Sequence, residues 1–293
     1  MRHRALSGMV LALACLMLLG GGVGGCGLRR TTVEVDGPAL GPEYATQVNV
    51  DNWRGSVHVV ADPRASAPEV RYRNVKAGKM APRARDLPGM TTAFATTSFE
   101  GGHPVLRVVS RPAATGEAPD VATQLEVVVP RIHGVSIRNR GGPVEVQGFE
   151  GPVSIENGTT PTDGGDVAAW TGAAISDPVN ITTTRGRVVY QVGPGSTGRF
   201  DLSTDKGNAE FVSLLGQIDQ VLPEEGRYRG VLNKGSNPIM LHSGLGHVVA
   251  RVMENAATYG PELWAGELYW PAYPGWLAKM GETLHLRDPD APH

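Results

Sequence analysis

A glycine-rich hexapeptide is the first feature of the sequence that could carry chemistry. Residues 193–198 read Gly-Pro-Gly-Ser-Thr-Gly and match the G-x-G-x-x-G pattern of dinucleotide sites. A helix must follow such a turn, because its N-terminus receives the pyrophosphate. The residues that follow here, 199–210, have the alternation of a strand instead. We therefore predict a plain turn at this hexapeptide and no cofactor.

Acidic residues in the middle of the chain offer a second kind of chemistry. The candidates for a carbohydrate cleft are Asp163, Asp166, Asp177, Asp201 and Asp205. Paired carboxylates hydrolyse glycosides, and a lyase would also need a basic group such as Arg185 or Lys206. Asp201 and Asp205 flank apolar positions of a strand pattern, so we expect both to face solvent. Solvated turns are the favoured interpretation, and a polysaccharide-acting enzyme is the alternative.

Two histidines, His242 and His247, lie close together with Ser243 between them. A metal site would need a matching third ligand nearby, and a serine hydrolase would need a Gly-x-Ser-x-Gly elbow at the serine. The sequence around these residues has neither. We predict surface histidines, no metal site and no catalytic residues, and hence a protein that is not an enzyme.

Aromatic residues are concentrated near the C-terminus, where they could bind a ligand or cover a hydrophobic core. They are Trp264, Tyr269, Trp270, Tyr273 and Trp276, which include three of the five tryptophans of the chain. Such clusters stack on sugars, lie at membrane interfaces or bury a core. We expect a short helical cap over the end of the folded domain, in which Pro261 begins a helix and Pro271 ends it. A ligand-binding platform is the alternative.

The N-terminus has the pattern of an export signal. Arg2 and Arg4 precede an 11-residue apolar run, Met9–Leu19, which is too short to span a bilayer as a helix. Small residues then lead to Cys26, and this arrangement resembles the bacterial lipobox, whose cysteine receives the lipid. The resemblance implies that residues 1–25 are removed and that Cys26 anchors the chain to a membrane.

The anchor implies a location in the bacterial cell envelope. Gly27 stands where an aspartate commonly retains lipoproteins in an inner membrane, so we expect the outer membrane. Cys15 lies in the signal, which leaves no disulfide in the mature chain. The net charge of −2 over 293 residues argues against a nucleic-acid partner. The expected partners are therefore the membrane, through the lipid, and an envelope protein or polysaccharide.

An internal repeat supplies the elements that must position all of these residues. Its template is two alternating apolar residues, then Asn, Thr or Ser, then Gly three residues later, then two more alternating apolar residues. Copies one to three have Val48, Val50, Asn52, Gly55, Val57, Val59; Val135, Ile137, Asn139, Gly142, Val144, Val146; and Val179, Ile181, Thr183, Gly186, Val188, Tyr190. Copies four and five have Phe200, Leu202, Thr204, Gly207, Ala209, Phe211; and Ile239, Leu241, Ser243, Gly246, Val248, Ala250. A degenerate copy has Val153, Ile155, Asn157, Gly165, Val167 and Ala169.

The template describes two short strands joined by a corner. Alternation with period two buries one face of each arm, and the Asn, Thr or Ser starts a turn by bonding to the backbone. The predicted corner glycines, Gly55, Gly142, Gly165, Gly186, Gly207 and Gly246, provide a positive φ or a close backbone approach. Copies three and four are 21 residues apart, from Val179 to Phe200, so we expect Gly186 and Gly207 at equivalent corners of adjacent coils.

Two all-β architectures fit this repeat. The near-constant period favours a β-solenoid, and a sandwich of hairpins is the alternative. The looser first third predicts an irregular or antiparallel N-terminal section, with a hairpin over 91–110 and a strand over 124–130. The predicted organisation is a signal (1–25), a tether (26–46), a strand-repeat domain (47–254) and a C-terminal aromatic cap and tail (255–293).

The repeat, with its preceding Leu-x-Val-x-Val-Pro strand at Leu125–Pro130, resembles the bacterial "putative adhesin" domain family over residues 47–252. The resemblance implies an envelope-associated β-repeat protein without catalytic residues. We therefore expect a non-catalytic lipoprotein that acts as a scaffold, an adhesin-like protein or a binding module. A polysaccharide lyase or glycosidase and an envelope-stress regulator are the alternatives.

Overall fold

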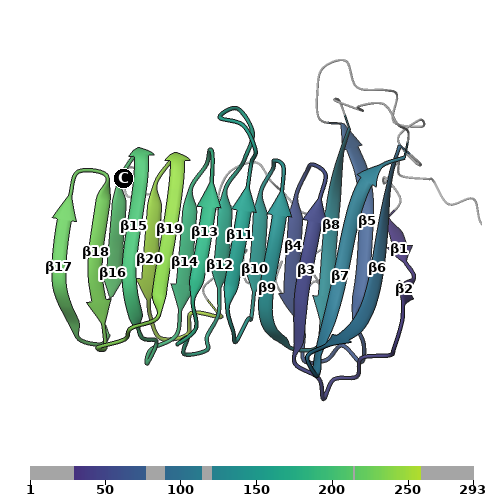
Figure 1. The fold of residues 1–293 in the computed structure, drawn as a ribbon, viewed down its shortest axis with the longest axis horizontal. Helices are drawn as coiled ribbons and strands as arrows, with labels where there is room; N and C mark the ends of the chain where they lie inside the picture. Colours follow the sequence, from purple (N-terminus) through teal and green to yellow (C-terminus); the bar gives the residue numbers. More distant parts are fainter. Residues whose placement is uncertain (1–29, 77–89, 114–120, 214, 259–293) are drawn as a thin grey trace, which may run out of the picture.

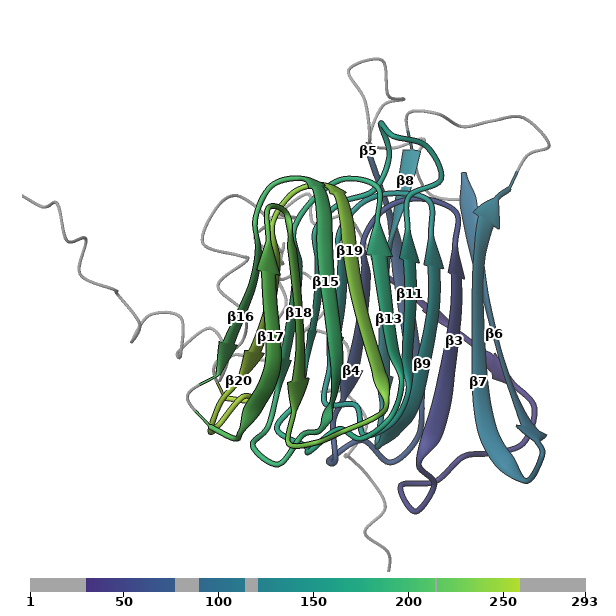
Figure 2. The same ribbon diagram turned by 60° about the vertical axis from the view of Figure 1, so that its left-hand side comes forward.

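Two large β-sheets form the described part of the protein. The structure is a computed structural model and describes residues 30–76, 90–113, 121–213 and 215–258. Those residues form strands and turns only, with no helix among them. The two sheets face each other along the length of the molecule (Figures 1 and 2) and enclose one continuous core of Val, Ile and Leu side chains.

The nine-stranded sheet is mixed. Its order is β1 (Thr31–Val33), β5 (Glu69–Lys76), β8 (Val121–Val129), β4 (Val57–Ala61), β10 (Val144–Gln147), β12 (Val167–Trp170), β14 (Val188–Val192), β20 (Val248–Val252) and β16 (Ala209–Ser213). All pairs from β8 to β16 are parallel, and the pairs at the β1 end are antiparallel.

The eleven-stranded sheet is also mixed. Its order is β17 (Ile218–Glu224), β18 (Arg227–Leu232), β15 (Gly198–Lys206), β19 (Pro238–Leu245), β13 (Val179–Thr183), β11 (Val153–Asn157), β9 (Ile132–Asn139), β3 (Thr46–Asn52), β7 (His103–Pro112), β6 (Thr91–Glu100) and β2 (Val35–Asp36). The pairs from β15 to β7 are parallel. The expected hairpin near residues 91–110 is β6–β7, and the expected strand near 124–130 is β8.

The sequence repeat corresponds to the sheet register. Each copy gives its first arm to the eleven-stranded sheet and its second arm to the nine-stranded sheet. The degenerate copy keeps this register, since Val153 pairs with Val135 on one side and with Val179 on the other. Its five extra residues therefore lie in the corner and do not shift the strands.

The order of the copies in space differs from the predicted order. β19 lies between β13 and β15, and β20 lies between β14 and β16, so copy five separates copies three and four. The prediction that Gly186 and Gly207 are adjacent is wrong, because Gly246 stands between them. The hairpin β17–β18 explains this order. β18 pairs with the outer edge of β15, which leaves only the inner edge for copy five.

The corners carry a ladder of buried amides. Asn139 Nδ2 donates to Gly55 O at 3.0 Å and lies 3.0 Å from Asn157 Oδ1, while Asn52 Nδ2 donates to Asn139 Oδ1 at 2.9 Å. Each side chain thus bonds to the neighbouring copy. The sequence predicted only a bond within the local turn. Gly165 differs from the other corner glycines, since it has no positive φ and is required by close approach to Gly142.

The position of the fifth copy also changes the cap prediction. The sequence predicts a cap directly after copy five, on the assumption that this copy ends the stack. That assumption is wrong, since β16, β17 and β18 lie at that end (Figure 1). The cap aromatics Trp264, Tyr269, Trp270, Tyr273 and Trp276 lie outside the described residues, as does the expected helix.

The N-terminal predictions fall partly outside the described chain. Cys26 and the apolar run before it are not described. The expected tether contributes more than a linker, because Thr31–Val33 pairs with β5 and Val35–Asp36 pairs with β6. In the described part of the chain, no helix is long and apolar enough to cross a membrane.

Candidate functional site

A shallow groove of about 380 Å³ crosses the outer face of the eleven-stranded sheet, where its central strands begin. It is lined by Gln47, His103, His133, Gly134, Val135, Ser136, Pro152, Val153, Ser154, Pro178, Val179, Asn180, Pro238 and Met240. These residues come from β3, β7, β9, β11, β13 and β19 and from the turns before them. The groove therefore runs across the strands, along the direction in which the copies stack.

The parallel register produces this groove. Ser136, Ser154, Asn180 and Met240 are direct neighbours on successive strands and alternate with buried core residues. Neighbouring strands lie about 4.8 Å apart, so one outward side chain stands at each such step. The result is a row of small polar groups that ends in an exposed methionine.

Proline and histidine rings form the other border of the groove. Pro152 and Pro178 precede their strands, and their carbonyls still accept bonds from Val135 N and Val153 N. Proline is tolerated at a strand start, because its missing N–H is not needed there. The rings of His103 and His133 stack with their centroids 6.2 Å apart. Proline and histidine rings therefore line this side of the groove.

The chemistry of the groove suits an extended, uncharged ligand. None of its lining residues is Asp, Glu, Lys or Arg. Hydroxyl and amide groups can donate and accept hydrogen bonds, and the rings offer apolar contact. The sequence did not predict this site. The signal was present in the outward positions of the repeat, but only the strand order shows which of them are neighbours.

The glycine-rich hexapeptide forms the turn between β14 and β15. Ser196 Oγ donates to Gly193 O and accepts from Ile175 N at 3.0 Å. The chain continues directly into a strand, β15, so no helix N-terminus faces this turn. Its serine holds the turn together and is fully buried.

The predicted acidic residues do not converge. Asp201 accepts two hydrogen bonds from Arg227, at 2.9 and 2.5 Å, and lies 3.7 Å from Arg229. Asp166 pairs with Arg187 at 3.2 Å in the corners that precede β12 and β14. Asp163 lies in the corner after β11, and Asp177 lies before β13.

His242 and Ser243 point to opposite faces of β19. Ser243 Oγ is buried and donates to Gly186 O at 2.7 Å. His242 faces outward, with Nδ1 3.1 Å from Ser203 Oγ and Nε2 4.0 Å from Asp205. His247 Nδ1 accepts from the backbone of Asn208 in the next corner. The two histidines therefore contact different residues and do not form one site.

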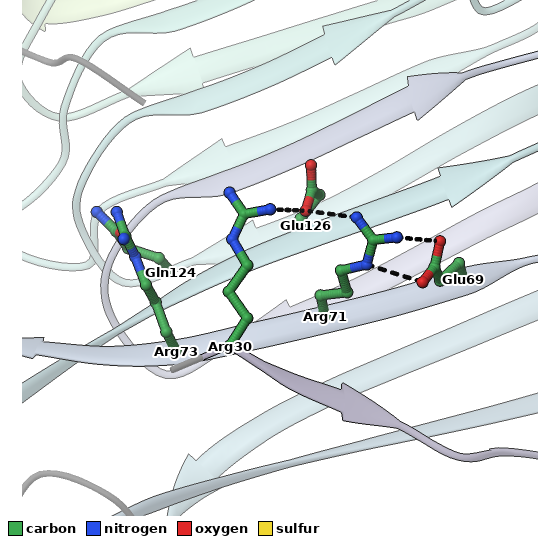
Figure 3. Close-up of polar contacts among 6 residues, drawn as sticks. All are labelled: Arg30, Glu69, Arg71, Arg73, Gln124 and Glu126. Atoms are coloured by element: carbon green, nitrogen blue, oxygen red, sulfur yellow. Dashed lines mark hydrogen bonds and ion pairs between the residues drawn. The ribbon is translucent and has the colours of Figure 1, made fainter. Parts of the chain in front are cut away.

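An arginine cluster stands on the outer face of the nine-stranded sheet, at the β1 end (Figure 3). Arg30 Nη1 lies 3.1 Å from Glu126 Oε2, and Arg71 lies 3.7 Å from the same carboxylate. Arg71 also forms a two-bond pair with Glu69, at 2.8 and 2.6 Å. The register of β5 and β8 places these side chains in one row.

Arg73 completes the cluster and contacts Gln124. Partial burial, with the nearby charge of Arg30, lowers the pKa of Arg73 below its ordinary value, against the opposing effect of Glu126. Arg30, Arg71 and Arg73 outnumber the carboxylates Glu69 and Glu126. In the described residues, no group of three or more His, Cys, Asp or Glu could hold a metal ion.

Comparisons with known proteins give little further identification. No family model matches the sequence, and no curated protein matches it. A solved structure of a "putative cell adhesion protein" from Clostridium sporogenes is 8% identical with a TM-score of 0.45, and the match covers 77% of this chain and 99% of that one. A "putative adhesin" from Bacteroides fragilis is 8% identical with a TM-score of 0.25, covering 77% and 97%. At these values, neither neighbour carries a functional argument.

Proposed function

We propose that this chain is a non-catalytic envelope lipoprotein that binds a neutral polysaccharide in the groove of its eleven-stranded sheet. The observation that carries the proposal is the groove itself, because it is open, crosses six strands and has no Asp, Glu, Lys or Arg in its lining. Its row of hydroxyl and amide groups, set about 4.8 Å apart, offers repeated hydrogen bonds to a repetitive polymer. In this proposal the stacked copies are a two-sheet β-solenoid that serves as a rigid support.

The proposed lipid anchor fits the position of the arginine cluster. Cys26 precedes Arg30 by four residues, which reach at most about 14 Å when extended. A lipid on Cys26 would therefore hold Arg30, and with it the β1 end, close to the headgroups. The groove lies on the outer face of the other sheet, from β7 to β19, and would stay open to the envelope.

An enzyme acting on polysaccharide is less well supported by the geometry. A glycosidase needs two carboxylates on either side of one sugar bond. Asp201 is engaged by two arginines, and Asp166 lies in the corner before β12, a strand of the other sheet. The groove itself contributes no carboxylate.

The groove proposal predicts that Ser154→Trp weakens polysaccharide binding at least tenfold, because the indole would fill the middle of the row. The measurement is the retardation of the purified protein in gels that contain neutral cell-envelope polysaccharide. Glu156→Trp is the matched control, since Glu156 is exposed on the same strand and face but does not line the groove. Equal retardation of both variants and wild type would exclude the groove. If the protein binds an envelope protein and not a polysaccharide, the proposed class of ligand is wrong.

The anchor proposal predicts that Cys26→Ser moves the protein from the membrane fraction to the soluble exported fraction. Without the thiol no lipid can be attached, and the charged mature domain has no other expected anchor. Fractionation with immunodetection of both proteins, after a carbonate wash, provides the measurement. Complete retention of Cys26→Ser in the membrane would contradict the lipoprotein assignment.

A further inference from the structure

The centre of the nine-stranded sheet is buried on its outer face, although an outer face is expected to be exposed to solvent. Along β12, Ala168 and Trp170 point away from the core and are 0% and 4% exposed. On β14, Val189 also points outward and is 6% exposed. The other sheet shows the contrast, because the outward residues of β11, Ser154 and Glu156, are exposed. Something therefore covers the centre of the nine-stranded sheet.

The cover is not another part of the two sheets. Ala168, Trp170 and Val189 form a second hydrophobic cluster with Val249, separate from the main core. All four residues belong to the nine-stranded sheet itself, and every described strand is already placed in one of the two sheets. The cluster thus lacks its second layer among the described residues, although an apolar sheet face requires one.

The end of the described chain lies at this face. After β20 the chain turns, and Gln191 Nε2 donates to Ala256 O at 2.9 Å. A Cβ added at Gly172, just beyond β12, would stand 3.2 Å from Ala257. The chain therefore leaves the described region next to β12 and β14, directly beside the buried cluster.

We propose that the C-terminal segment, residues 259–293, covers the outer face of the nine-stranded sheet from β14 to β4. Its first tryptophan, Trp264, follows Thr258 by six residues, which span about 20 Å when extended. The four strands to be covered extend about 14 Å. The five aromatic residues of this segment each bury roughly 150–250 Å², enough to cover such a patch.

This placement assigns the aromatic segment to a face of the stack and not to its end. The covered area extends to His58 on β4 and Glu145 on β10, which point outward and are each 4% exposed. At the other side the cover ends before β16, where outward-facing Val212 is 45% exposed. The inference is independent of the ligand proposed for the other sheet.

Hydrogen exchange of the full chain, followed by mass spectrometry, tests the proposal. Amides within residues 262–276 are expected to exchange at least tenfold slower than in a synthetic peptide of the same sequence. Val189→Asp should restore the peptide rate, because it places a charge in the contact. Val212→Asp is the matched control, since Val212 faces the same side of the same sheet but is exposed, and it should leave the protection unchanged.

The protection of β11 and β13 amides reports whether each variant stays folded. If Val189→Asp loses that protection, the isosteric Val189→Thr takes its place and should lower the protection of residues 262–276 severalfold. Peptide-like exchange in the wild type would overturn the proposal, as would protection that survives the Val189 substitution. A wild-type dimer in sedimentation with an unprotected segment would assign the cover to a second copy and would equally overturn it.

Discussion

Gly186→Ala is expected to lower the free energy of unfolding by about 3 kcal/mol or more. Gly186 has a φ of +110°, where an L side chain is strained by roughly 1–3 kcal/mol. A Cβ there would also stand 2.6 Å from the Asp166 backbone nitrogen and from Gly165 O of the neighbouring copy. Both atoms are backbone and belong to the stacked corner, so relief would require the copies to separate. Overpacking of this kind typically adds about 1–3 kcal/mol.

Gly195→Ala is the matched control for this prediction. Gly195 also has a positive φ, +88°, but its added Cβ would meet only Ala174 Cβ at an ordinary 3.6 Å. We expect a loss of about 1 kcal/mol, from backbone strain alone. Urea unfolding of both variants measures the difference. Equal losses would show that the contact between neighbouring corners contributes nothing and that conformation alone requires glycine at Gly186.

The strand pattern of the repeat was readable because it depends on local physics. Alternation, the corner polar residue and the glycine each act within one copy, so the sequence predicts both arms and their inward faces. The sequence predicts Asn157 as a corner residue even though its copy is interrupted, and its side chain bonds to Gly142 O as well as to its own corner. Stacking identical corners reinforces each local preference, which makes the signal strong.

The order of the copies could not be predicted from the sequence, because it depends on which edge of a strand remains available for pairing. Nothing within copy four indicates that β18 will pair with the outer edge of β15. The groove depends on the same information, since Asn180 and Met240 become neighbours only when β19 inserts beside β13. The functional surface is therefore set by connectivity over long sequence separations, whereas the repeat is set by nearest neighbours.

The last expected result concerns a buried histidine. Lowering the pH from 7 to 4 should reduce the stability of the wild type by about 3 kcal/mol more than that of His58→Gln. Burial, with the nearby charge of Arg30, lowers the pKa of His58 from 6.5 to about 4. Between these two values the unfolded chain binds a proton at this imidazole and the folded chain does not. The contribution is therefore present above pH 6.5 and is lost as the pH falls towards 4.

The surroundings of His58 define the control for this experiment. Glu145 Oε2 lies 3.4 Å from His58 Nε2, Glu126 is the neighbour on β8, and Arg30 contacts Glu126. These groups all remain in His58→Gln, so the two proteins differ only in the side chain at position 58. His242→Gln, which replaces an outward-facing imidazole, is the control for the loss of a histidine as such. Thermal or urea unfolding at closely spaced pH values gives the curves. Parallel curves for the wild type and His58→Gln would show that His58 is charged in the folded state, paired with Glu145, and that the face above it admits water.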